Sequence, residues 1–562
     1  MYEQLAYLVP GASVAAFVAQ RAWRRLQLSR AKHPSLAGHS RWSRRFARQV
    51  PFYSHDDARF FRADDAPVEV AQTRRDAFER LTARYASRYA ASVAQTARLE
   101  PGIPDLQFTA RYRVPFPFRD RVRASLRHGS VLVATRGNRV VDADGNESWD
   151  LTGSYGVNLF GNEFYKRCMA EGAALTSDLG AMLGAYHPST AYILRRLREV
   201  SGHEQASFHM SGTEAVMQAV RVAQYNTGRR RIVRFCGAYH GWWGDVQPGV
   251  GNPQPARDTW TLREGDERTL TVLRTRRDIA CVLVNPLQAL HPNASAPSDS
   301  QLIDSSRTAA VDREAYARWL RQLREVCTQR GIVLIFDEVF VGFRLAAGGA
   351  QEYFGVRADL VTYGKTLGGG LPVGVVCGPA SLMRRYREDR PADICFARGT
   401  FNAHPQVMGA MHQFLRYLET DEARDLYRDV DAVWNRRAAL LNARLQEAGL
   451  PVQIVNLGSI WTVCYTRPSR YNWMLQYYLR AEGLHLPWIG TGRFIFSLDY
   501  SDADFSAVAD AFAAAAAAMD RDGWWWNDGR LTNKLIRRRA LREMAQAWWR
   551  PWFGSISSPR SR

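Results

Sequence analysis

The stretch GIVLIFDEVFVGFRLAAGGAQEYFGVRADLVTYGKTLGGGLP, Gly331–Pro372, contains two short apolar runs that each lead to a charged residue. The first run, Ile332–Phe336, leads into Asp337, and the second, Leu360–Tyr363, leads through one glycine into Lys365. Short, unalternating runs rich in β-branched residues are typical of parallel strands covered on both faces, and ligands of such sheets bind beyond the carboxyl ends of the strands. We therefore expect an α/β fold in which both charged side chains face one crevice.

An aspartate and a lysine in one crevice suit pyridoxal phosphate. Lys365 would condense with the cofactor aldehyde as a Schiff base, and Asp337 would keep the pyridine nitrogen protonated so that the ring accepts electrons. Once substrate displaces it, the lysine amine is free to move a proton between substrate and cofactor carbons. The alternative is a structural ion pair at the end of a sheet, and the surrounding motifs decide between the two.

A second motif, FHMSGTEAV, spans Phe208–Val216. It predicts a strand that ends at Met210 and a helix that opens with Ser211, Gly212 and Thr213. Free backbone amides at a helix N-terminus, with two hydroxyls beside them, form a phosphate site. A simple helix cap has the same sequence, so this motif alone leaves both interpretations open.

Together these motifs make the chain resemble the class III, or fold type I, aminotransferases. The resemblance includes the glutamate-1-semialdehyde aminomutases and the aminotransferase domains of polyketide and peptide synthases, and it extends from about Val131 to about Ala518. It implies a fold type I pyridoxal-phosphate-dependent transferase, with a large domain whose mostly parallel sheet is flanked by helices and a smaller α+β domain. It also implies pyridoxal 5'-phosphate as the cofactor.

The same resemblance assigns further cofactor contacts. Tyr239, in CGAYHGW (236–242), would lie face-on to the pyridine ring, and Val339 would hold the ring from the opposite side. His240 would support this loop or serve a structural purpose only. Thr400, in RGTFNAHP, would reach the phosphate of the partner subunit's cofactor, which implies a homodimer with shared active sites.

Candidate substrate residues carry less information. The apolar run Ala280–Val284 is expected to form another strand, after which the relatives usually have Glu-Pro. This chain has Asn285 before the proline and Gln288 shortly after, so substrate preference does not carry over from them. Tyr155 suits a pocket wall, and a buried core tyrosine is the alternative. Trp488 and Arg493 suit a substrate channel, and a core tryptophan and a surface arginine are their alternatives.

Composition sets broader limits. The chain has 562 residues, too many for one ordinary domain, and its 46% hydrophobic content suffices for a packed core. Its seven cysteines are scattered without metal-ligand spacing, which favours a reducing, cytoplasmic compartment. The formal charge of +20 indicates nucleic acid, an anionic membrane or an acidic protein as a partner, or reflects the arginine bias of a GC-rich genome. Without a zinc-finger or RNA-binding aromatic pattern, nucleic acid is not expected.

We expect five segments along the chain. They are a basic N-terminal extension of unknown role (1–104), the N-terminal part of the small domain with the substrate mouth (105–178), the large cofactor-binding domain (179–420), the C-terminal small domain (421–520) and a Trp/Arg-rich tail (521–562). The extension begins with an apolar run, Leu5–Ala19, which is followed by arginines. This run is short for a membrane span and has the wrong charge order for a signal peptide, so we expect an amphipathic arm that packs on the body or lies on a membrane surface.

The tail is rich in tryptophan and basic residues. Its members are Trp524, Trp525, Trp526, Trp548, Trp549 and Trp552, with Arg530, Lys534, Arg537, Arg538, Arg539 and Arg542. Basic helices edged with tryptophan suit a membrane interface, or an acidic acyl carrier protein that delivers a tethered substrate. Packing against the N-terminal extension is the alternative.

These observations predict an aminotransferase that moves an amino group from an amino donor to a ketone or aldehyde acceptor by ping-pong half-reactions. The relatives suggest an acyl or carrier-bound acceptor of secondary metabolism. An aminomutase, which moves the amino group within one molecule, would use the same residues. A third hypothesis is a degenerate binding module for a membrane or carrier protein, against which the complete set of cofactor residues argues.

Overall fold

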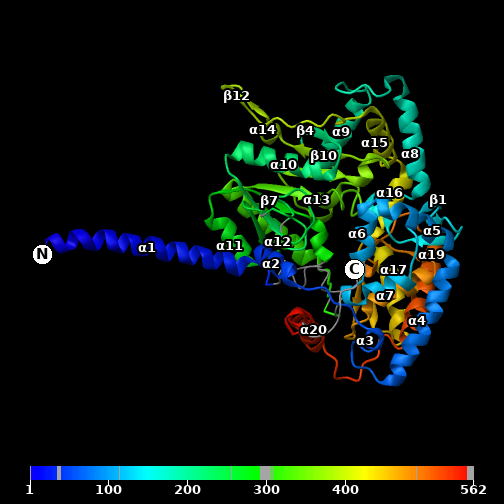
Figure 1. Ribbon diagram of the computed structural model, residues 1–562. Helices are drawn as coiled ribbons and strands as arrows, with labels where there is room; N and C mark the ends of the chain where they lie inside the picture. Colours follow the sequence, from blue (N-terminus) through cyan, green and yellow to red (C-terminus); the bar gives the residue numbers. More distant parts are fainter. Residues whose placement is uncertain are drawn as a thin grey trace.

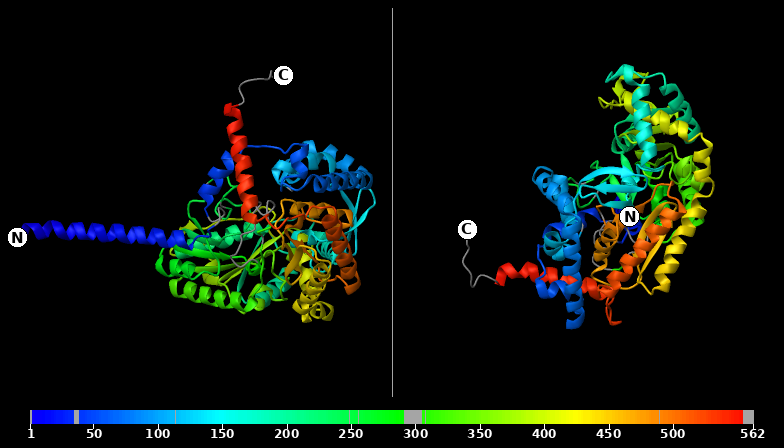
Figure 2. Two further views of the ribbon diagram at one scale, coloured as in Figure 1. Left: turned by 90° about the horizontal axis from the view of Figure 1, so that it is seen from below. Right: turned by 90° about the vertical axis from the view of Figure 1, so that its right-hand side faces the viewer.

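The computed structural model describes residues 2–34, 39–112, 114–247, 249–254, 256–290, 305–306, 308–488 and 490–553. A large α/β domain and a smaller α+β domain form the body of the molecule (Figure 1). The N-terminal extension covers part of the smaller domain, and its first helix projects away from the body (Figures 1 and 2).

A seven-stranded sheet forms the centre of the large domain. Its strands, in spatial order, are β4 (Gln205–His209), β10 (Gly374–Gly378), β9 (Leu360–Gly364), β8 (Val333–Asp337), β7 (Ile279–Val284), β5 (Arg231–Phe235) and β6 (Thr259–Leu262). Neighbouring strands are parallel except at β10, which runs antiparallel to both of its neighbours. The predicted mostly parallel sheet is confirmed.

Helices cover both faces of this sheet. Every residue of β7, β8 and β9 is buried. Ile335 belongs to an apolar cluster with α10 (Gly212–Thr227), whereas its neighbour Phe336 belongs to the cluster that includes α11 (Glu267–Thr275) and α12 (Arg313–Arg330). Successive side chains of a strand point to opposite faces, so burial on both faces explains the unalternating apolar sequence.

The smaller domain contains two sheets. One comprises β1 (Leu132–Arg136), β2 (Arg139–Asp142), β3 (Glu147–Asp150) and β15 (Leu484–His485), and the other comprises β13 (Val452–Leu457), β14 (Ile460–Tyr465) and β16 (Phe494–Ile495). Because β15 pairs with β3, segments far apart in sequence form one sheet. The helices are α17 (Val430–Glu447), α18 (Leu475–Ala481) and α19 (Asp502–Arg521).

Among the described residues, the body also contains six further α-helices and a hairpin. They are α8 (Asn162–Leu175), α9 (Thr190–Ser201), α13 (Gly349–Phe354), α14 (Ala380–Met383), α15 (Pro405–Tyr417) and α16 (Asp421–Arg428), with a hairpin of β11 (Tyr386–Arg387) and β12 (Arg390–Ile394).

The extension packs on the smaller domain through α3 (Asp57–Phe61), α4 (Val68–Arg88) and α5 (Ala90–Leu99). It is followed by α6 (Pro104–Tyr112) and α7 (Arg119–Ser125). A fully buried ion pair, Arg74 to Asp64 at 2.7 Å, lies in this contact. The Arg74 side chain also donates to the carbonyl oxygen of Gly523 at 2.8 Å. The extension is therefore joined to the segment that follows α19.

The start of the tail is buried against the extension and the smaller domain. Trp524 and Trp525 are both 0% exposed, and their indole nitrogens donate to the Tyr478 hydroxyl at 2.8 Å and to Asn472 Oδ1 at 2.9 Å. The membrane and carrier interpretations are wrong for these two tryptophans, because neither ring can reach a partner. The structure instead has the alternative, in which these two tryptophans pack against the extension and the smaller domain.

The remaining tail forms α20 (Asn533–Phe553). It is fastened by Glu543, whose carboxylate pairs with Arg470 at 2.7 Å and Arg59 at 3.0 Å. Trp526 is half-buried and Trp548 is exposed, whereas the side chains of Trp549 and Trp552 lie outside the described residues.

Two further helices begin the chain, α1 (Tyr2–Ala31) and α2 (Ser40–Gln49). The end of α1 packs on the large domain, where Ala31 is buried and its carbonyl oxygen accepts a bond from the Arg263 amide at 2.9 Å. The rest of α1 extends into solvent (Figure 2). Across the described residues, no helix has both the length and the apolar character needed to cross a bilayer.

Candidate functional site

Asp337 and Lys365 lie at neighbouring strand ends. Asp337 is the last residue of β8, and the register places it opposite Thr362 of β9. Lys365 follows β9 directly and begins a short 3-10 helix, Lys365–Gly368. Its φ of +47° is in the left-handed region, which costs a non-glycine residue free energy and is typical of functional sites. The sheet topology therefore places the two residues at the same edge, as predicted.

Three groups hold the Asp337 carboxylate. The Nδ1 atom of His240 lies 2.7 Å from Oδ2, while the Val339 amide and the Thr362 hydroxyl donate to Oδ1, each at 3.2 Å. Burial lowers the pKa of His240 despite the opposing effect of the carboxylate. A neutral imidazole therefore donates its Nδ1 proton to Asp337. Its other nitrogen, Nε2, is buried and has no partner among the described residues.

The lysine amine lies in a largely apolar environment. Its Nζ is 5.6 Å from the centroid of the Phe340 ring. A Cβ on Gly156 would lie 2.6 Å from that ring and 3.3 Å from Cδ of the lysine, so only glycine fits beside them. Burial lowers the pKa of Lys365, with Asp337 opposing and Arg344 adding to the shift. The amine is thus more readily deprotonated, and more nucleophilic, than an exposed lysine.

Arg493 approaches the same aromatic ring. Its guanidinium carbon is 5.8 Å from the Phe340 centroid, while the lysine Nζ is 5.6 Å from it. The arginine is half-buried, and its place in a substrate channel stays a prediction. A fixed positive charge here can bind a substrate carboxylate close to the reactive amine.

Arg344 connects three parts of the site. Its buried guanidinium donates to the carbonyl oxygens of Asn158 and Phe496, each at 2.7 Å, and to the Ser459 hydroxyl at 3.1 Å. Burial lowers its pKa to about 10. The loop after β8, the segment around Gly156 and the smaller domain are therefore held together beside the lysine.

The N-terminus of α10 lies next to the loop after β8. A Cβ on Gly212 would be 2.5 Å from Val339 Cγ1, which shows how closely the helix approaches this loop. The Ser211 hydroxyl accepts a bond from the Glu214 amide at 3.2 Å, so the helix-cap role is present. The phosphate role of Ser211, Gly212 and Thr213 stays a prediction, for which the unpaired amides of a first helical turn are suited.

The Tyr239 loop is positioned by Asn285. The Asn285 amide donates to the Tyr239 carbonyl oxygen at 3.3 Å, and its oxygen accepts from the Leu287 amide at 3.2 Å. Its side chain is thus engaged by backbone groups, and a substrate contact stays a prediction. The Tyr239 side chain is 62% exposed, which leaves its ring available to stack on a ligand.

The other predicted residues are more scattered. Tyr155 is half-exposed at a φ of +57°, so the alternative of a buried core tyrosine is wrong. Trp488 is half-buried, and its ring centroid lies 6.1 Å from that of Phe108 in α6. Thr400 is exposed on a loop, and Gln288 lies in a short 3-10 helix, with its side chain outside the described residues.

Sequence reasoning missed four contributors, namely Gly156, Phe340, Arg344 and Thr362. Thr362 could have been noticed as a threonine within the apolar run that leads to Lys365. The other three contribute through contacts between domains, for which the sequence offers no local signal.

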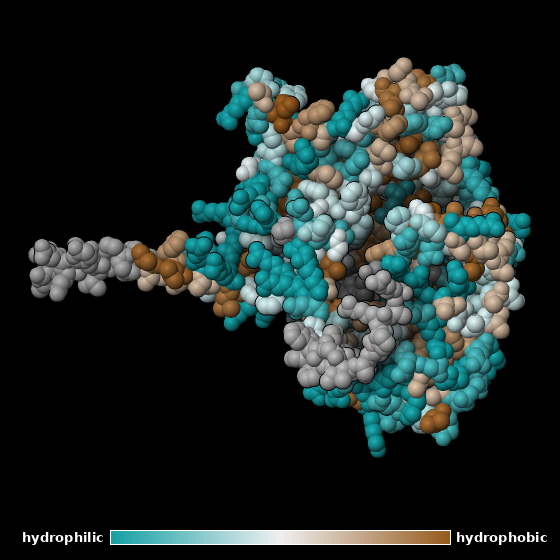
Figure 3. Space-filling model, viewed as in Figure 1, coloured by the Kyte–Doolittle hydropathy of each residue, from teal (hydrophilic) through white to brown (hydrophobic). Residues whose placement is uncertain are grey.

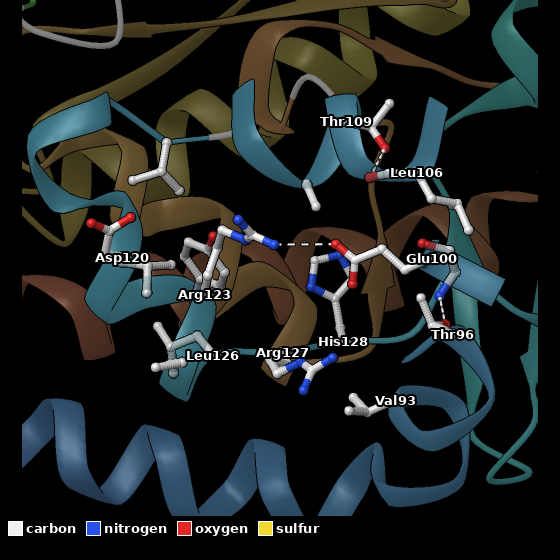
Figure 4. A pocket seen from close by; sticks show the side chains of 16 residues that line it. Val93, Thr96, Glu100, Leu106, Thr109, Asp120, Arg123, Leu126, Arg127 and His128 are labelled. Carbon is white, nitrogen blue, oxygen red and sulfur yellow. Dashed lines mark hydrogen bonds and ion pairs between the residues drawn. The ribbon is translucent and has the colours of Figure 1, made fainter. Parts of the chain in front are cut away.

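A separate cavity lies between the extension and α18, and none of the candidate residues lines it (Figure 4). The Glu100 and Arg123 side chains form an ion pair of 3.1 Å in its wall, with His128 below them in the view.

Comparison with known proteins gives concordant matches. A model of the aminotransferase class-III family matches residues 123–516. The chain is 32% identical to a glutamate-1-semialdehyde 2,1-aminomutase of Geotalea daltonii over 361 residues, which is 60% of this chain and 77% of that protein. It is 30% identical to the same enzyme of Nitratidesulfovibrio vulgaris over 420 residues, 72% of this chain and 96% of the other. A solved transaminase with bound pyridoxal phosphate matches 76% of this chain and 96% of its own, with 26% identity and a TM-score of 0.60.

Proposed function

The chain belongs to the class-III aminotransferases, and from this premise we propose that it transfers an amino group between a small amino donor and a ketone or aldehyde acceptor. Enzymes of this family use pyridoxal 5'-phosphate, and the chain is accordingly a pyridoxal-phosphate-dependent aminotransferase. The observation that carries the proposal is the buried Asp337–His240 pair beside the partly desolvated amine of Lys365.

The residues present fit this cofactor. Asp337 is 3% exposed, and the neutral imidazole of His240 is the only basic side chain within ion-pair distance of it in the described chain. A buried carboxylate beside a neutral imidazole still lacks a positive charge, which a protonated pyridine nitrogen would provide. Ser211, Gly212 and Thr213 would hold the phosphate, and Tyr239 and Val339 would enclose the ring.

Each residue has a distinct task in the proposed reaction. When bound, pyridoxal phosphate supplies an aldehyde that takes up the amino group and a ring that stabilises negative charge on the adjacent carbon. Lys365 Nζ holds and moves the proton at the reacting carbon, because its lowered pKa favours the neutral amine. Asp337 would hold the proton at the ring nitrogen, and His240 would orient the carboxylate through its Nδ1 hydrogen bond.

The donor and acceptor are proposed more narrowly from the residues around the lysine. Arg493 would bind the carboxylate of an amino acid donor. The Phe108–Trp488 pair gives the segment leading to Arg493 an aromatic side that suits an acyl acceptor of secondary metabolism, free or attached to a carrier protein. Rates with the same acyl group on carrier and as the free acid would separate these two forms.

An intramolecular aminomutase is the second candidate, because both curated relatives described above carry that activity in their names. A donor-dependence assay separates the two. The purified holoenzyme should lose its visible cofactor absorbance when the correct amino acid is added alone, and should regain it with the acceptor. Turnover of a single substrate without a second one would instead support the mutase.

Lys365→Ala provides the direct test of the proposed mechanism. This variant should abolish turnover while the fold is retained, as judged by circular dichroism and the unfolding midpoint. Retained turnover in a folded Lys365→Ala protein would contradict the proposed role of the amine.

We propose a homodimer with shared sites, because Thr400, which is expected to reach the cofactor of the partner subunit, is exposed in the single chain. Other large side chains, Met182, Tyr186, Trp242, Phe396 and Phe401, are also exposed in the single chain. Such a set of exposed apolar side chains is typical of an interface.

Complementation would test the shared site. Lys365→Ala and Thr400→Ala homodimers should each be impaired. Mixed dimers should regain activity, because one site then combines an intact lysine from one copy with an intact threonine from the other. Absence of any recovery in verified mixed dimers would contradict the shared site.

We also propose a cytoplasmic location for the catalytic body. All seven cysteines are free and buried, as suits a reducing compartment.

A further inference from the structure

The first helices of the chain have an extreme charge distribution. Residues 4–55 contain nine basic residues and no acidic one. The bases are Arg21, Arg24, Arg25, Arg30, Lys32, Arg41, Arg44, Arg45 and Arg48. Large apolar residues are interleaved with them, so this segment combines positive charge with hydrophobic surface.

The described side chains of α1 are mostly exposed. Every residue from Val14 to Leu26 is exposed, including Phe17 at 61% and Val18 at 58%. Figure 3 shows apolar surface on α1 where the helix leaves the body. An isolated helix in water is only marginally stable, and most helices are stabilised by packing of one face. A partner outside this chain that covers the exposed part of α1 would therefore stabilise the helix.

At the body, α1 forms one wall of a strongly basic hollow. Its lining consists of Arg21, Arg24, Arg25, Leu28, Trp260, Arg274, Thr275, Arg276, Arg277, Asp278 and Arg330, with one acidic residue among them. Arg276 donates to the Arg24 carbonyl oxygen at 2.6 Å, which fixes the helix to this surface. The positive charge of α1 is thus continuous with that of the large domain.

The second helix, α2, presents a clear outer face. Its attachment is polar, through Arg44, which donates to the Asn252 carbonyl oxygen at 3.4 Å, and no residue of α2 is buried. With 100° between successive residues, Trp42 and Phe46 lie on the side opposite Arg44. They are 62% and 42% exposed, and the Arg45 guanidinium lies 5.5 Å from the Trp42 ring centroid.

We propose that α1 and α2 bind the surface of an anionic lipid bilayer. The arginines would pair with lipid phosphates, while Trp42, Phe46 and Phe17 would enter the boundary between headgroups and acyl chains. The membrane contact is thus assigned to α1 and α2 and not to the tail, whose first tryptophans are buried. This inference is independent of the reaction proposed above.

Charge and hydrophobicity argue against two other partners for this face, a second copy of the chain and a nucleic acid. A second copy of this face would bring nine further bases against the first nine without any acid to pair them, which is repulsive. Nucleic acid would satisfy the arginines, but it would leave the aliphatic and aromatic side chains Val14, Val18 and Phe46 in water. An anionic bilayer would pair with the arginines and would also cover the aliphatic and aromatic side chains.

The attachment of α2 gives the contact a defined position. Asn252, which accepts its bond, belongs to the segment that follows the Tyr239–His240 loop. The candidate site and the lipid-binding face are therefore connected through one short stretch of the large domain.

Flotation of the full-length holoprotein with vesicles tests the inference. The probes are vesicles of phosphatidylcholine alone and vesicles that also contain phosphatidylglycerol. We expect flotation only with the anionic vesicles, and less of it in high salt. Trp42→Ser/Phe46→Ser should lower the partition coefficient at least tenfold, while activity on soluble substrates stays unchanged. Arg41→Gln/Arg45→Gln should lower it by roughly fivefold per arginine, since each basic residue near an anionic surface contributes about that factor.

Matched controls use exposed residues elsewhere. Arg424→Gln/Arg428→Gln on α16 removes two exposed arginines, and Leu440→Ser/Val133→Ser removes two exposed apolar residues. Both controls should float like the wild type.

Several results would overturn the inference. They are equal flotation with neutral vesicles, no flotation with anionic ones, or wild-type flotation of Trp42→Ser/Phe46→Ser. Binding to a DNA duplex in place of vesicles would assign the face to nucleic acid. Loss of dimer mass in the Trp42→Ser/Phe46→Ser variant without vesicle binding by the wild type would assign it to a second copy.

Discussion

The imidazole Nδ1 of His240 lies 2.7 Å from Oδ2 of Asp337, and both side chains are almost completely buried. The histidine reaches this position from the loop after β5, whereas the aspartate ends β8. Because burial lowers the pKa of His240, the imidazole stays neutral and acts as a hydrogen-bond donor without bringing a competing positive charge. The carboxylate is thereby oriented while its charge remains available to a ligand.

His240→Phe should lower kcat/KM by about 10- to 100-fold, since a hydrogen bond to a charged group contributes about 1.5–3 kcal/mol. KM for the donor should change little, because His240 positions Asp337 and does not contact substrate. The pH profile of the bound cofactor's absorbance should shift, which a merely structural role would not cause. His240→Asn, which keeps an N–H donor, should recover part of the activity. An unshifted pH profile in His240→Phe would contradict the positioning role.

Asp337→Asn should lower kcat/KM by at least ~10²-fold, because a neutral amide cannot stabilise a protonated ring nitrogen. The substitution keeps the shape of the side chain, so the cofactor should still bind and the unfolding midpoint should stay close to that of the wild type. Steady-state kinetics and the cofactor absorbance of the purified protein measure both. Activity within a few-fold of wild type would refute the role of this carboxylate.

Lys365→Met should stabilise the cofactor-free protein at neutral pH. Burial lowers the pKa of Lys365 below its ordinary value of 10.5. Between the lowered pKa and 10.5 the unfolded chain binds more protons than the folded one, so wild-type stability rises with pH in that window. Below the lowered pKa, the wild-type protein bears the full free-energy cost of burying the charged amine.

The advantage of Lys365→Met should therefore shrink as the pH rises toward 10.5. Urea unfolding of the apoproteins at several pH values measures it. Lys166→Met, which changes an exposed lysine on α8, serves as the control and should show a much smaller effect. A constant difference between Lys365→Met and wild type across this range would contradict the shifted pKa.

The sequence predicted most of the large domain because its signals are local. The apolar runs before Asp337 and Lys365 became β8 and β9 within one residue at each end. Parallel order then follows from general rules of α/β sheets, which is why two strand ends sufficed to locate the chemistry.

The parts that were mispredicted or missed depend on contacts between distant segments. Trp524 and Trp525 have the same sequence character as membrane-interface residues, yet they are buried because the extension covers them. Arg344 bonds to segments near residues 158 and 496, and neither partner can be inferred from its neighbours in sequence. Tertiary packing decides both cases.

Arg74→Met should destabilise the protein by about 3–5 kcal/mol, because it leaves the buried Asp64 without its partner. Both side chains of this pair are 0% exposed, and the guanidinium lies 4.4 Å from the Tyr471 ring and 5.8 Å from the Trp524 ring. Urea unfolding followed by tryptophan fluorescence would report the change. Asp64→Asn/Arg74→Met should recover part of the loss, and a double variant no better than the single one would argue against an uncompensated charge.

Arg493→Gln should raise KM for donors that carry a carboxylate by about 10- to 100-fold, the effect of about 1.5–3 kcal/mol for a charge-assisted hydrogen bond. The guanidinium lies over the same Phe340 ring as the lysine amine, so a carboxylate bound there would place the adjacent amino group near Lys365. Amines that lack a carboxylate should keep their KM, and this contrast separates substrate binding from a general disturbance of the site. Arg493→Lys should recover part of the preference, and Arg136→Gln, an exposed arginine on β1, should leave it unchanged. Equal effects on both classes of donor would show that Arg493 supports the fold and does not select the substrate.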